Sequence, residues 1–249
     1  MSTYDYKIGK CRINRILTSK TEIKRTKKIP AADCEFSYDN GVRTWVAALF
    51  VDIVDSSDLF KNEKDEIVAR IMRSFCSELI GILKTNENYR QIGIRGDCVY
   101  AIYSAPSADN LESILDDAIM INTFQKMFQK MLSENSFPEF KIGIGLGASE
   151  DLVIKAGKKG SGISDNIWIG SSVVNASKLS SEANRRQFRP IVMDATFYDR
   201  IKRKKVGDNK TYLQYAKRQW SIKLNEYVYG FNLVYKKFDE WIVRGMKDE

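Results

Sequence analysis

The feature that most constrains the fold is the apolar run from Trp45 to Val54, the longest in the chain. Its continuous pattern, with Val and Ile, predicts a strand buried on both faces, and the run is too short to cross a bilayer. Asp52 interrupts it near its end. A carboxylate there is costly to bury unless a cation or hydrogen-bond donors accompany it. We therefore expect an apolar core with one acid that needs a partner.

The segments that follow alternate between helix and strand patterns. Apolar residues recur every fourth position from Ile67 to Leu83, which predicts a helix with one buried stripe. The apolar runs Gln91–Ile94 and Cys98–Tyr103 flank Arg95-Gly96-Asp97, which predicts a β-hairpin. Further elements are expected as a helix at Ala108–Leu132, strands at Phe140–Leu146 and Leu152–Ala156, a turn at Gly157–Gly162, a short run at Ile167–Gly170, a helix at Ser172–Ala183, a strand at Pro190–Met193 and a helix at Ala195–Ile201. The core order β-α-β-β-α-β predicts an α+β, ferredoxin-like fold: an antiparallel sheet with helices on one face.

Three regions are expected along the chain. Residues 1–43 are basic and weakly periodic, and form an N-terminal extension with room for one or two edge strands. Residues 44–202 form the core domain. Residues 203–249 are basic and aromatic, and form a C-terminal extension, with a hairpin and a last helix, packed on the same domain. No internal repeat divides the chain further.

Composition excludes several kinds of chemistry. The chain has no histidine, which rules out a Ser-His-Asp triad, a His general base and a His-ligated metal. The four cysteines form no C-x-x-C pair, so we expect reduced thiols rather than a zinc site: Cys11, Cys34, Cys76 and Cys98. The 40 Lys and Arg residues exceed the 32 Asp and Glu residues, giving a net charge of +8. This charge suits a nucleotide, a nucleic acid or a membrane surface, and a merely solvated basic surface explains it equally well. No signal peptide opens the chain, and we expect a soluble, cytoplasmic protein.

A second acid, Asp97, lies at the tight turn of the predicted hairpin, where a scaffold can hold a carboxylate rigidly. If the hairpin pairs beside the strand of Asp52, both carboxylates meet at one sheet edge. Two carboxylates and a strand-end carbonyl suit Mg²⁺ or Mn²⁺, and two such ions about 4 Å apart stabilise the charge that develops on a triphosphate. The alternative is that Asp52 caps a helix or forms a salt bridge and Asp97 is an ordinary turn residue.

Three motifs resemble the class III adenylate/guanylate cyclase domain. Residues 49–57 read LFVDIVDSS and residues 94–101 read IRGDCVYA, similar to the family's F-x-D-I-x-x-x-[ST] and G-D-x-x-x-A. Residues 167–170 read IWIG and are followed by Val173, Ala176, Ser177, Lys178 and Leu179, similar to I-W-G-x-x-V-N-x-A-x-[RK]-[LM]. The three motifs stand in the family's order and cover roughly residues 45–200.

This resemblance implies a two-metal nucleotide cyclase. It implies that Asp52 and Asp97 hold two Mn²⁺ or Mg²⁺ ions with help from the Ile53 carbonyl. It also implies that the backbone amides of the turn from Val54 to Ser57, which includes Ser56 and Ser57, lie against the phosphates.

The third motif implies a composite site in a head-to-tail homodimer. Lys178 matches the basic residue that stabilises the transition state from across the dimer interface, although many members have an arginine with its bidentate fork there. The family's asparagine falls at Val174, whereas this chain has Asn175 one position later, about 100° around a helix. Asn175 therefore takes the catalytic role only if the register shifts.

The residues expected near the base argue against the usual recognition of a purine. Adenylate cyclases of this family carry a lysine four residues before the second metal aspartate, where this chain has Gly93. Arg95 faces the same way two residues later, and its donors suit the carbonyl oxygens of a pyrimidine. A phosphate contact or a salt bridge is the other interpretation of Arg95. Asp165 or Asn166 is expected to contact the base edge from the partner's loop.

The compact chain, its R-G-D hairpin and its I-W-I-G and S-K-L strings resemble the pyrimidine cyclases of the bacterial Pycsar anti-phage systems. These convert UTP to 3′,5′-cyclic UMP, or CTP to cyclic CMP, with release of diphosphate, and the product activates a separate effector. We expect UTP because arginine offers only donors and uracil presents two carbonyls. The alternatives are a cytidylate cyclase, an adenylate or guanylate cyclase, and a non-catalytic nucleotide-binding domain. A nucleic-acid-binding tail would explain the charge but neither aspartate, so we expect no nucleic acid and no membrane as partner.

Overall fold

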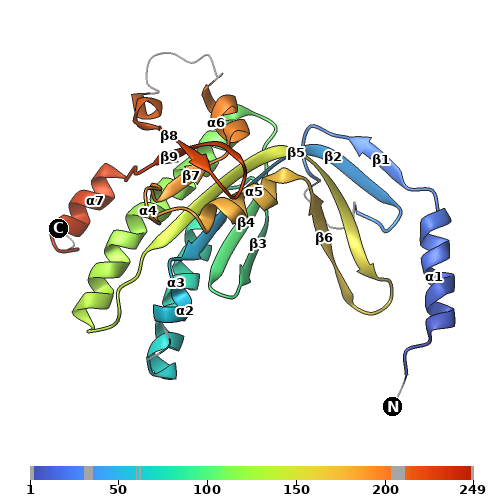
Figure 1. Cartoon of the computed structure of the whole chain (residues 1–249), viewed down its shortest axis with the longest axis horizontal. Coiled ribbons are helices and arrows are strands. Elements are labelled where there is room, and N and C mark those ends of the chain that lie inside the picture. Colours follow the sequence, from blue (N-terminus) through green and yellow to red (C-terminus); the bar gives the residue numbers. More distant parts are fainter. Residues whose placement is uncertain (1–2, 31–35, 60, 62, 203–210, 248–249) are drawn as a thin grey trace.

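The computed structural model describes residues 3–30, 36–59, 61, 63–202 and 211–247. Within these residues nine strands form one sheet in the order β3-β4-β2-β5-β7-β9-β8, with β1 paired to β2 and β6 paired to β5 (Figure 1). The strands are β1 Glu22–Arg25, β2 Asn40–Ile53, β3 Tyr89–Arg95, β4 Cys98–Ser104, β5 Ile142–Lys158, β6 Ile163–Ile169, β7 Ile191–Met193, β8 Lys217–Ser221 and β9 Glu226–Phe231. The helices are α1 Tyr6–Thr18, α2 Ser56–Leu59, α3 Asp65–Lys84, α4 Ala108–Glu134, α5 Ser171–Ser180, α6 Ala195–Lys202 and α7 Lys236–Val243, with a 3-10 turn, η2, at Thr211–Tyr215.

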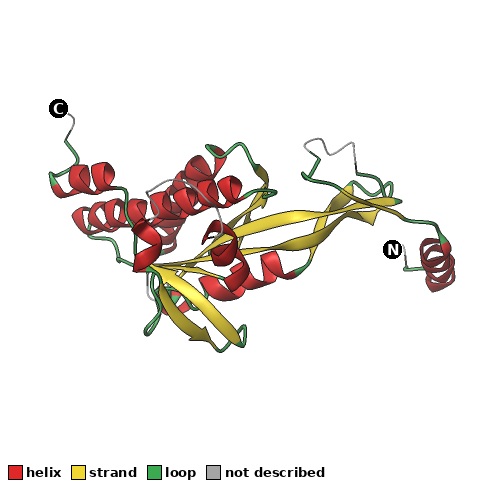
Figure 2. Cartoon of the chain, turned by 90° about the horizontal axis from the view of Figure 1, so that it is seen from above, coloured by secondary structure: helices red, strands yellow, loops and turns green. Residues whose placement is uncertain are grey.

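The predicted fold class is confirmed. β2, α3, β3, β4, α4 and β5 follow one another as β-α-β-β-α-β, and β2 lies between β4 and β5, antiparallel to both. The helices differ from the prediction in one respect, because they cover both faces of the sheet (Figure 2). Leu49 and Val51 of β2 pack into the main core with α3, α4 and α6, whereas Ala48 and Phe50 pack against Ala176 of α5 on the opposite face.

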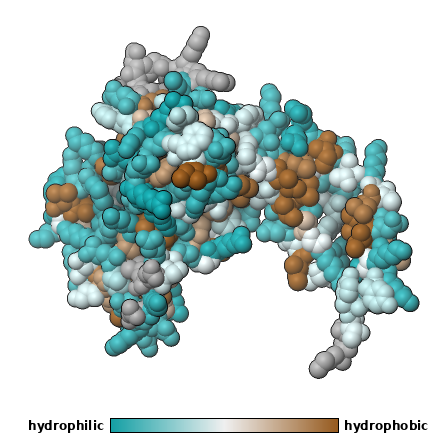
Figure 3. Space-filling model, in the orientation of Figure 1, coloured by the Kyte–Doolittle hydropathy of each residue, from teal (hydrophilic) through white to brown (hydrophobic). Residues whose placement is uncertain are grey.

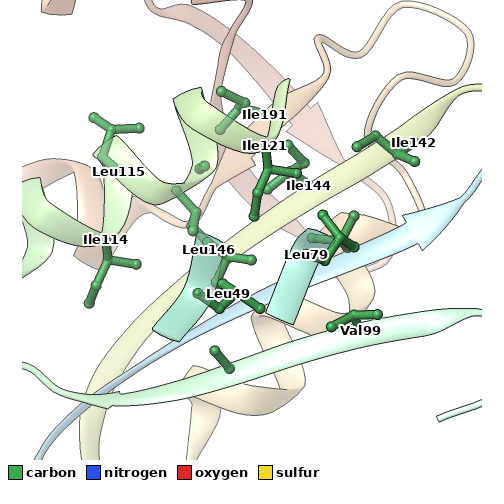
Figure 4. Packing of buried hydrophobic residues seen from close by; sticks show 14 of the residues in the cluster. Leu49, Leu79, Val99, Ile114, Leu115, Ile121, Ile142, Ile144, Leu146 and Ile191 are labelled. Atoms are coloured by element: carbon green, nitrogen blue, oxygen red, sulfur yellow. The ribbon is translucent and has the colours of Figure 1, made fainter. Parts of the chain in front are cut away.

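The main core forms where the α3 stripe meets the sheet and α4. The fourfold periodicity that predicted α3 is confirmed, since Ile71, Phe75, Leu79 and Leu83 are its buried residues. Figure 4 shows Leu79 close to Leu49, with side chains from β4, β5 and α4 completing the cluster. α4 begins with a capping box formed by Ser107 and Asn110, which satisfies backbone donors at its first turn.

α5 approaches β5 unusually closely because of a stripe of glycines. Gly143, Gly145 and Gly147 alternate along the side of β5 that faces α5. A Cβ atom on Gly145 would lie 2.0 Å from the carbonyl oxygen of Ala176 and 2.3 Å from the backbone nitrogen of Ser180. No side chain can occupy that space, so the stripe determines where α5 packs.

Several boundaries differ from the prediction. β5 is one strand of 17 residues in place of the two predicted strands, because β2 pairs with it continuously through Gly147–Glu150. β2 begins at Asn40, since its first residues pair with β1 and β5. The predicted domain division after residue 43 therefore falls inside β2, and the division after residue 202 borders residues outside the described part; both stay predictions. The expected tail hairpin and last helix are present as β8, β9 and α7.

One end of the sheet extends away from the core as an arm (Figures 1 and 2). The arm comprises β1, β6, residues 40–45 of β2 and residues 150–158 of β5. Beyond it lies α1, whose only buried residue is Gly9. Of the cysteines, Cys11, Cys76 and Cys98 are free thiols and Cys34 lies outside the described residues. No helix in the described ranges combines the length and apolarity that a bilayer crossing requires.

Candidate active site

Asp52 and Asp97 share one electrostatic environment at the end of the β2–β4 pair. Val51 pairs with Val99, so Asp52 lies level with Cys98, and Asp97 precedes Cys98 in the β3–β4 turn, where Gly96 has a φ of +63°. Burial raises the pKa of Asp52 above its ordinary value, Arg185 lowers it, and the charge of Asp97 raises it again. Burial and the charges of the two carboxylates raise the pKa of Cys98 to about 12. The pairing of the hairpin beside β2, on which the expected meeting of the two acids depended, is present, and the charge of Asp97 acts on Asp52; their role as metal ligands stays a prediction.

Arg185 is bound to the same site, from the loop that follows α5. Its Nη2 donates to Asp52 Oδ2 and to the Ile53 carbonyl oxygen, each at 3.0 Å, and its Nε lies 3.9 Å from Asp55 Oδ1. The guanidinium thus contacts two of the three predicted metal ligands. Asp52 therefore forms a salt bridge with Arg185, as the alternative interpretation of this residue proposed.

The turn after β2 is only partly available to a ligand. The Val54 amide donates to the Lys141 carbonyl at 2.8 Å. This amide is therefore not free to bind a phosphate, contrary to the expectation for the turn. Asp55 adopts a left-handed conformation with a φ of 55°, which turns the chain into α2. Ser56 is half-buried and Ser57 is exposed, and both lie close in sequence to the acidic site.

The position of the family's lysine is occupied by an aromatic ring. Gly93 pairs with Tyr100, and a Cβ atom on Gly93 would lie 2.5 Å from both Cζ and Oη of Tyr100. Tyr100 in turn stacks on Phe50, with ring centroids 5.0 Å apart and planes 13° from parallel. Burial and the charge of Asp165 raise the pKa of Tyr100, while Arg95 lowers it. Gly93 therefore makes room for a phenol whose pKa responds to the charges of Asp165 and Arg95.

β6 of the arm contacts β3 next to this surface. Gln91 of β3 donates to Asp165 Oδ2 at 3.2 Å and accepts from Trp168 Nε1 at 2.6 Å. Asp165, which we expected to act from the partner's loop, therefore faces β3 of its own chain. Asn166 donates its backbone N–H to Asp165 and, with it, borders a hollow of about 340 Å³. Arg95 is exposed at the near end of this surface.

Comparisons with known proteins identify the family. The chain is 38% identical over 245 residues, which is 98% of its length and 83% of the relative's, to a uridylate cyclase from Treponema porcinum. It is 32% identical over 185 residues, 71% of each protein, to a uridylate cyclase from Gulbenkiania mobilis. The chain belongs to the uridylate cyclase family. It is thus a nucleotide cyclase, and the sequence resemblance is confirmed.

Solved structures show that this chain has the class III cyclase fold. The guanylyl cyclase Cya2 superimposes with a TM-score of 0.62 and 13% identity, over 79% of this chain and 95% of that one. The adenylyl cyclase CyaB from P. aeruginosa superimposes with a TM-score of 0.62 and 18% identity, over 76% and 93%. No family model matches the chain.

Two predicted catalytic residues of this uridylate cyclase family member lie on α5, which is anchored at its start and along its length. Asp151 is fully buried and accepts from the Ser172 hydroxyl at the first turn of α5. Asn175 donates to Asp194 Oδ2 at 3.0 Å, which gives it a structural partner in its own subunit. Lys178 lies three residues later, close to one helical turn further along α5, and is exposed. Catalytic roles for Asn175 and Lys178 stay predictions.

Sequence reasoning missed three residues of this site. Arg185 follows α5 in a polar segment where nothing in the local pattern marks a side chain that reaches β2. Tyr100 falls on a position that the second family motif leaves open, although Gly93 across the hairpin is a signal of close approach. Gln91 carries no such signal, because its partners Asp165 and Trp168 are more than 70 residues away.

Proposed function

We propose that this protein converts UTP into 3′,5′-cyclic UMP and diphosphate. The reaction forms a bond between the ribose O3′ and the α-phosphorus and breaks the bond from that phosphorus to the diphosphate. The observation that carries the proposal is the convergence of Asp52 and Asp97 at one end of a sheet face that leads to Gly93 and Tyr100. Gly93 lies two residues before the end of β3, roughly 7 Å along the strand, and Asp97 lies beyond that end in the β3–β4 turn, so a triphosphate would lie at the turn and the base further along β3.

The donor set fits divalent cations. In the described part of the chain no three His, Cys, Asp or Glu side chains gather as a metal site, so two carboxylates need further oxygen ligands. Asp52, Asp97 and the Ile53 carbonyl would hold Mn²⁺ or Mg²⁺, which share phosphate oxygens with their substrates. Such ions supply charge for the leaving diphosphate and lower the pKa of a coordinated hydroxyl. The mutual repulsion of two carboxylates in a partly buried place is the electrostatic reason that a cation fits.

A pyrimidine suits the other end of this face better than a purine. The Tyr100 ring fills the space above Gly93, where a larger side chain or base would otherwise lie. Arg95 offers donors to the uracil carbonyl oxygens, and the Tyr100 hydroxyl and Asp165 are within electrostatic reach of one another. Both relatives are uridylate cyclases, which supports uracil over cytosine as the base of the substrate.

A homodimer would complete the site. Lys178 and Val174 are exposed on α5, and Ile163, Ile167 and Ile169 are exposed on β6; the exposures of Val174 and of the three isoleucines are 48%, 76%, 44% and 47%. Figure 3 shows apolar residues gathered over the arm, to which β6 belongs. Burial of this surface against a second copy would remove it from water and bring Lys178 to the partner's acids.

The direct test is product identification. The protein is incubated with each of the four ribonucleoside triphosphates and Mn²⁺. The products are separated and identified by mass spectrometry. We expect cyclic UMP to dominate, and Asp97→Asn to lower its rate by at least a hundredfold. Asp199→Asn, an exposed acid of α6, is the matched control and should retain full activity.

The same assay distinguishes the alternatives. Dominant cyclic CMP would indicate a cytidylate cyclase, and dominant cyclic AMP or cyclic GMP would overturn the pyrimidine assignment. Nucleotide binding without any cyclic product would indicate a non-catalytic domain. We also propose that the protein is cytoplasmic and that its product is a second messenger, which acts on a separate effector in anti-phage defence. The resemblance to the Pycsar cyclases supports this role. The proposed role is refuted if Asp52→Asn in the host leaves phage resistance unchanged.

A further inference from the structure

We propose that Arg185 sets the metal affinity of the site by competing with the metal ion for Asp52 and the Ile53 carbonyl. The inference rests on the proposed function, because it concerns the same cation site. It assigns to a loop residue outside all three family motifs a role in the binding of the metal.

The competition follows from shared atoms. Nη2 of Arg185 donates to Asp52 Oδ2 and to the Ile53 carbonyl oxygen, each at 3.0 Å. The two side chains are 23% and 20% exposed, so the bond is largely withdrawn from water and stronger than a surface ion pair. A guanidinium keeps its charge at every physiological pH, so it cannot yield to a metal ion by losing a proton. It must withdraw from those oxygens instead.

The other end of the same guanidinium is bonded to backbone carbonyl groups near the loop. Nη1 of Arg185 donates to the carbonyl oxygens of Ser180 and Ala183 at 3.2 and 3.4 Å, at the C-terminal end of α5. A helix C-terminus favours a cation, so these bonds can hold the side chain when Nη2 leaves. The backbone beside it is fixed, since Asn184 Nδ2 donates to the Ile142 carbonyl at 2.9 Å. Exchange therefore needs a movement of one side chain only.

The test measures binding of Mn²⁺ alone, by the loss of the electron paramagnetic resonance signal of the free ion, without nucleotide. If Arg185 occupies the metal ligands most of the time, only a fraction of the molecules can bind Mn²⁺. Removal of Arg185 then raises the apparent Mn²⁺ affinity by the inverse of that fraction. For a charge-assisted bond this predicts Mn²⁺ binding about tenfold tighter in Arg185→Gln than in the wild type. Arg186→Gln is the matched control: it makes the same charge change at the exposed neighbouring position. It should bind Mn²⁺ within about twofold of the wild type.

The outcomes separate this inference from the proposed function. Equal or weaker Mn²⁺ binding by Arg185→Gln, with normal binding by the wild type, overturns the role of Arg185 alone. No Mn²⁺ binding by either the wild type or Arg185→Gln overturns the metal site itself. Should Arg185→Gln not fold, Arg185→Lys carries the test, because a single ammonium cannot reproduce the fork, and this variant should bind Mn²⁺ more tightly than the wild type. An affinity equal to that of the wild type would again refute the competition.

Discussion

Replacing Gly145 by alanine tests the close packing that positions α5. The added methyl group would lie 2.0 Å from the carbonyl oxygen of Ala176 and 2.3 Å from the nitrogen of Ser180. Both are backbone atoms of α5, so no flexible side chain can move aside, and the helix must shift. Overpacking of this kind costs about 1–3 kcal/mol, and we expect about 3 kcal/mol of lost stability because a whole helix is displaced.

The assay is thermal unfolding, followed by circular dichroism. For a chain of this size each kcal/mol lowers Tm by about 2–4 °C, so Gly145→Ala should unfold roughly 6–12 °C below the wild type. Gly81→Ala is the matched control, since a methyl group there meets nothing within 4 Å on the exposed side of α3. It should raise the stability by about 0.5–1 kcal/mol, because alanine loses less entropy than glycine in a helix.

The two variants make the same chemical change, so their difference reports the local packing. A Tm for Gly145→Ala equal to that of the wild type would refute the reasoning, since the space for α5 over β5 would then not depend on the missing side chain. Cyclase activity should fall with Tm in Gly145→Ala, because α5 carries Lys178.

Three further predictions concern the site and the core. Mixing Asp52→Asn with Lys178→Ala chains should restore about a quarter of wild-type cyclase activity through the single intact site of each heterodimer; no recovery would place each site within one chain. Tyr100→Phe should raise the KM for UTP up to about tenfold at unchanged Tm, and an unchanged KM would remove its hydroxyl from base recognition. Burial raises the pKa of Asp117 to about 7. Below that pH the folded state keeps a proton that the unfolded chain releases above about pH 4, so this residue lowers stability as pH rises through 4–7, and Asp117→Asn should flatten the decline in denaturant titrations.

Much of the architecture is determined by local sequence patterns. The fourfold apolar period of residues 67–83 predicts α3, and the apolar runs around Arg95-Gly96-Asp97 predict the β3–β4 hairpin. The expected approach of Asp97 to Asp52 depended on whether the hairpin pairs beside β2, and the structure has that pairing. These inferences hold because period and turn chemistry are encoded by residues close together in the chain.

Only the tertiary structure decided which distant groups meet. Arg185 binds Asp52 across 133 residues, Asp165 reaches Gln91 across 74, and Asn175 binds the buried Asp194 instead of facing solvent. The position of α5 on the opposite face of the sheet from α3 and α4 likewise depends on tertiary packing, since α5 packs against the glycine stripe of β5. A local pattern specifies the type of an element and its buried face, whereas the partner of a polar side chain depends on how whole elements pack together, which no short stretch of sequence encodes.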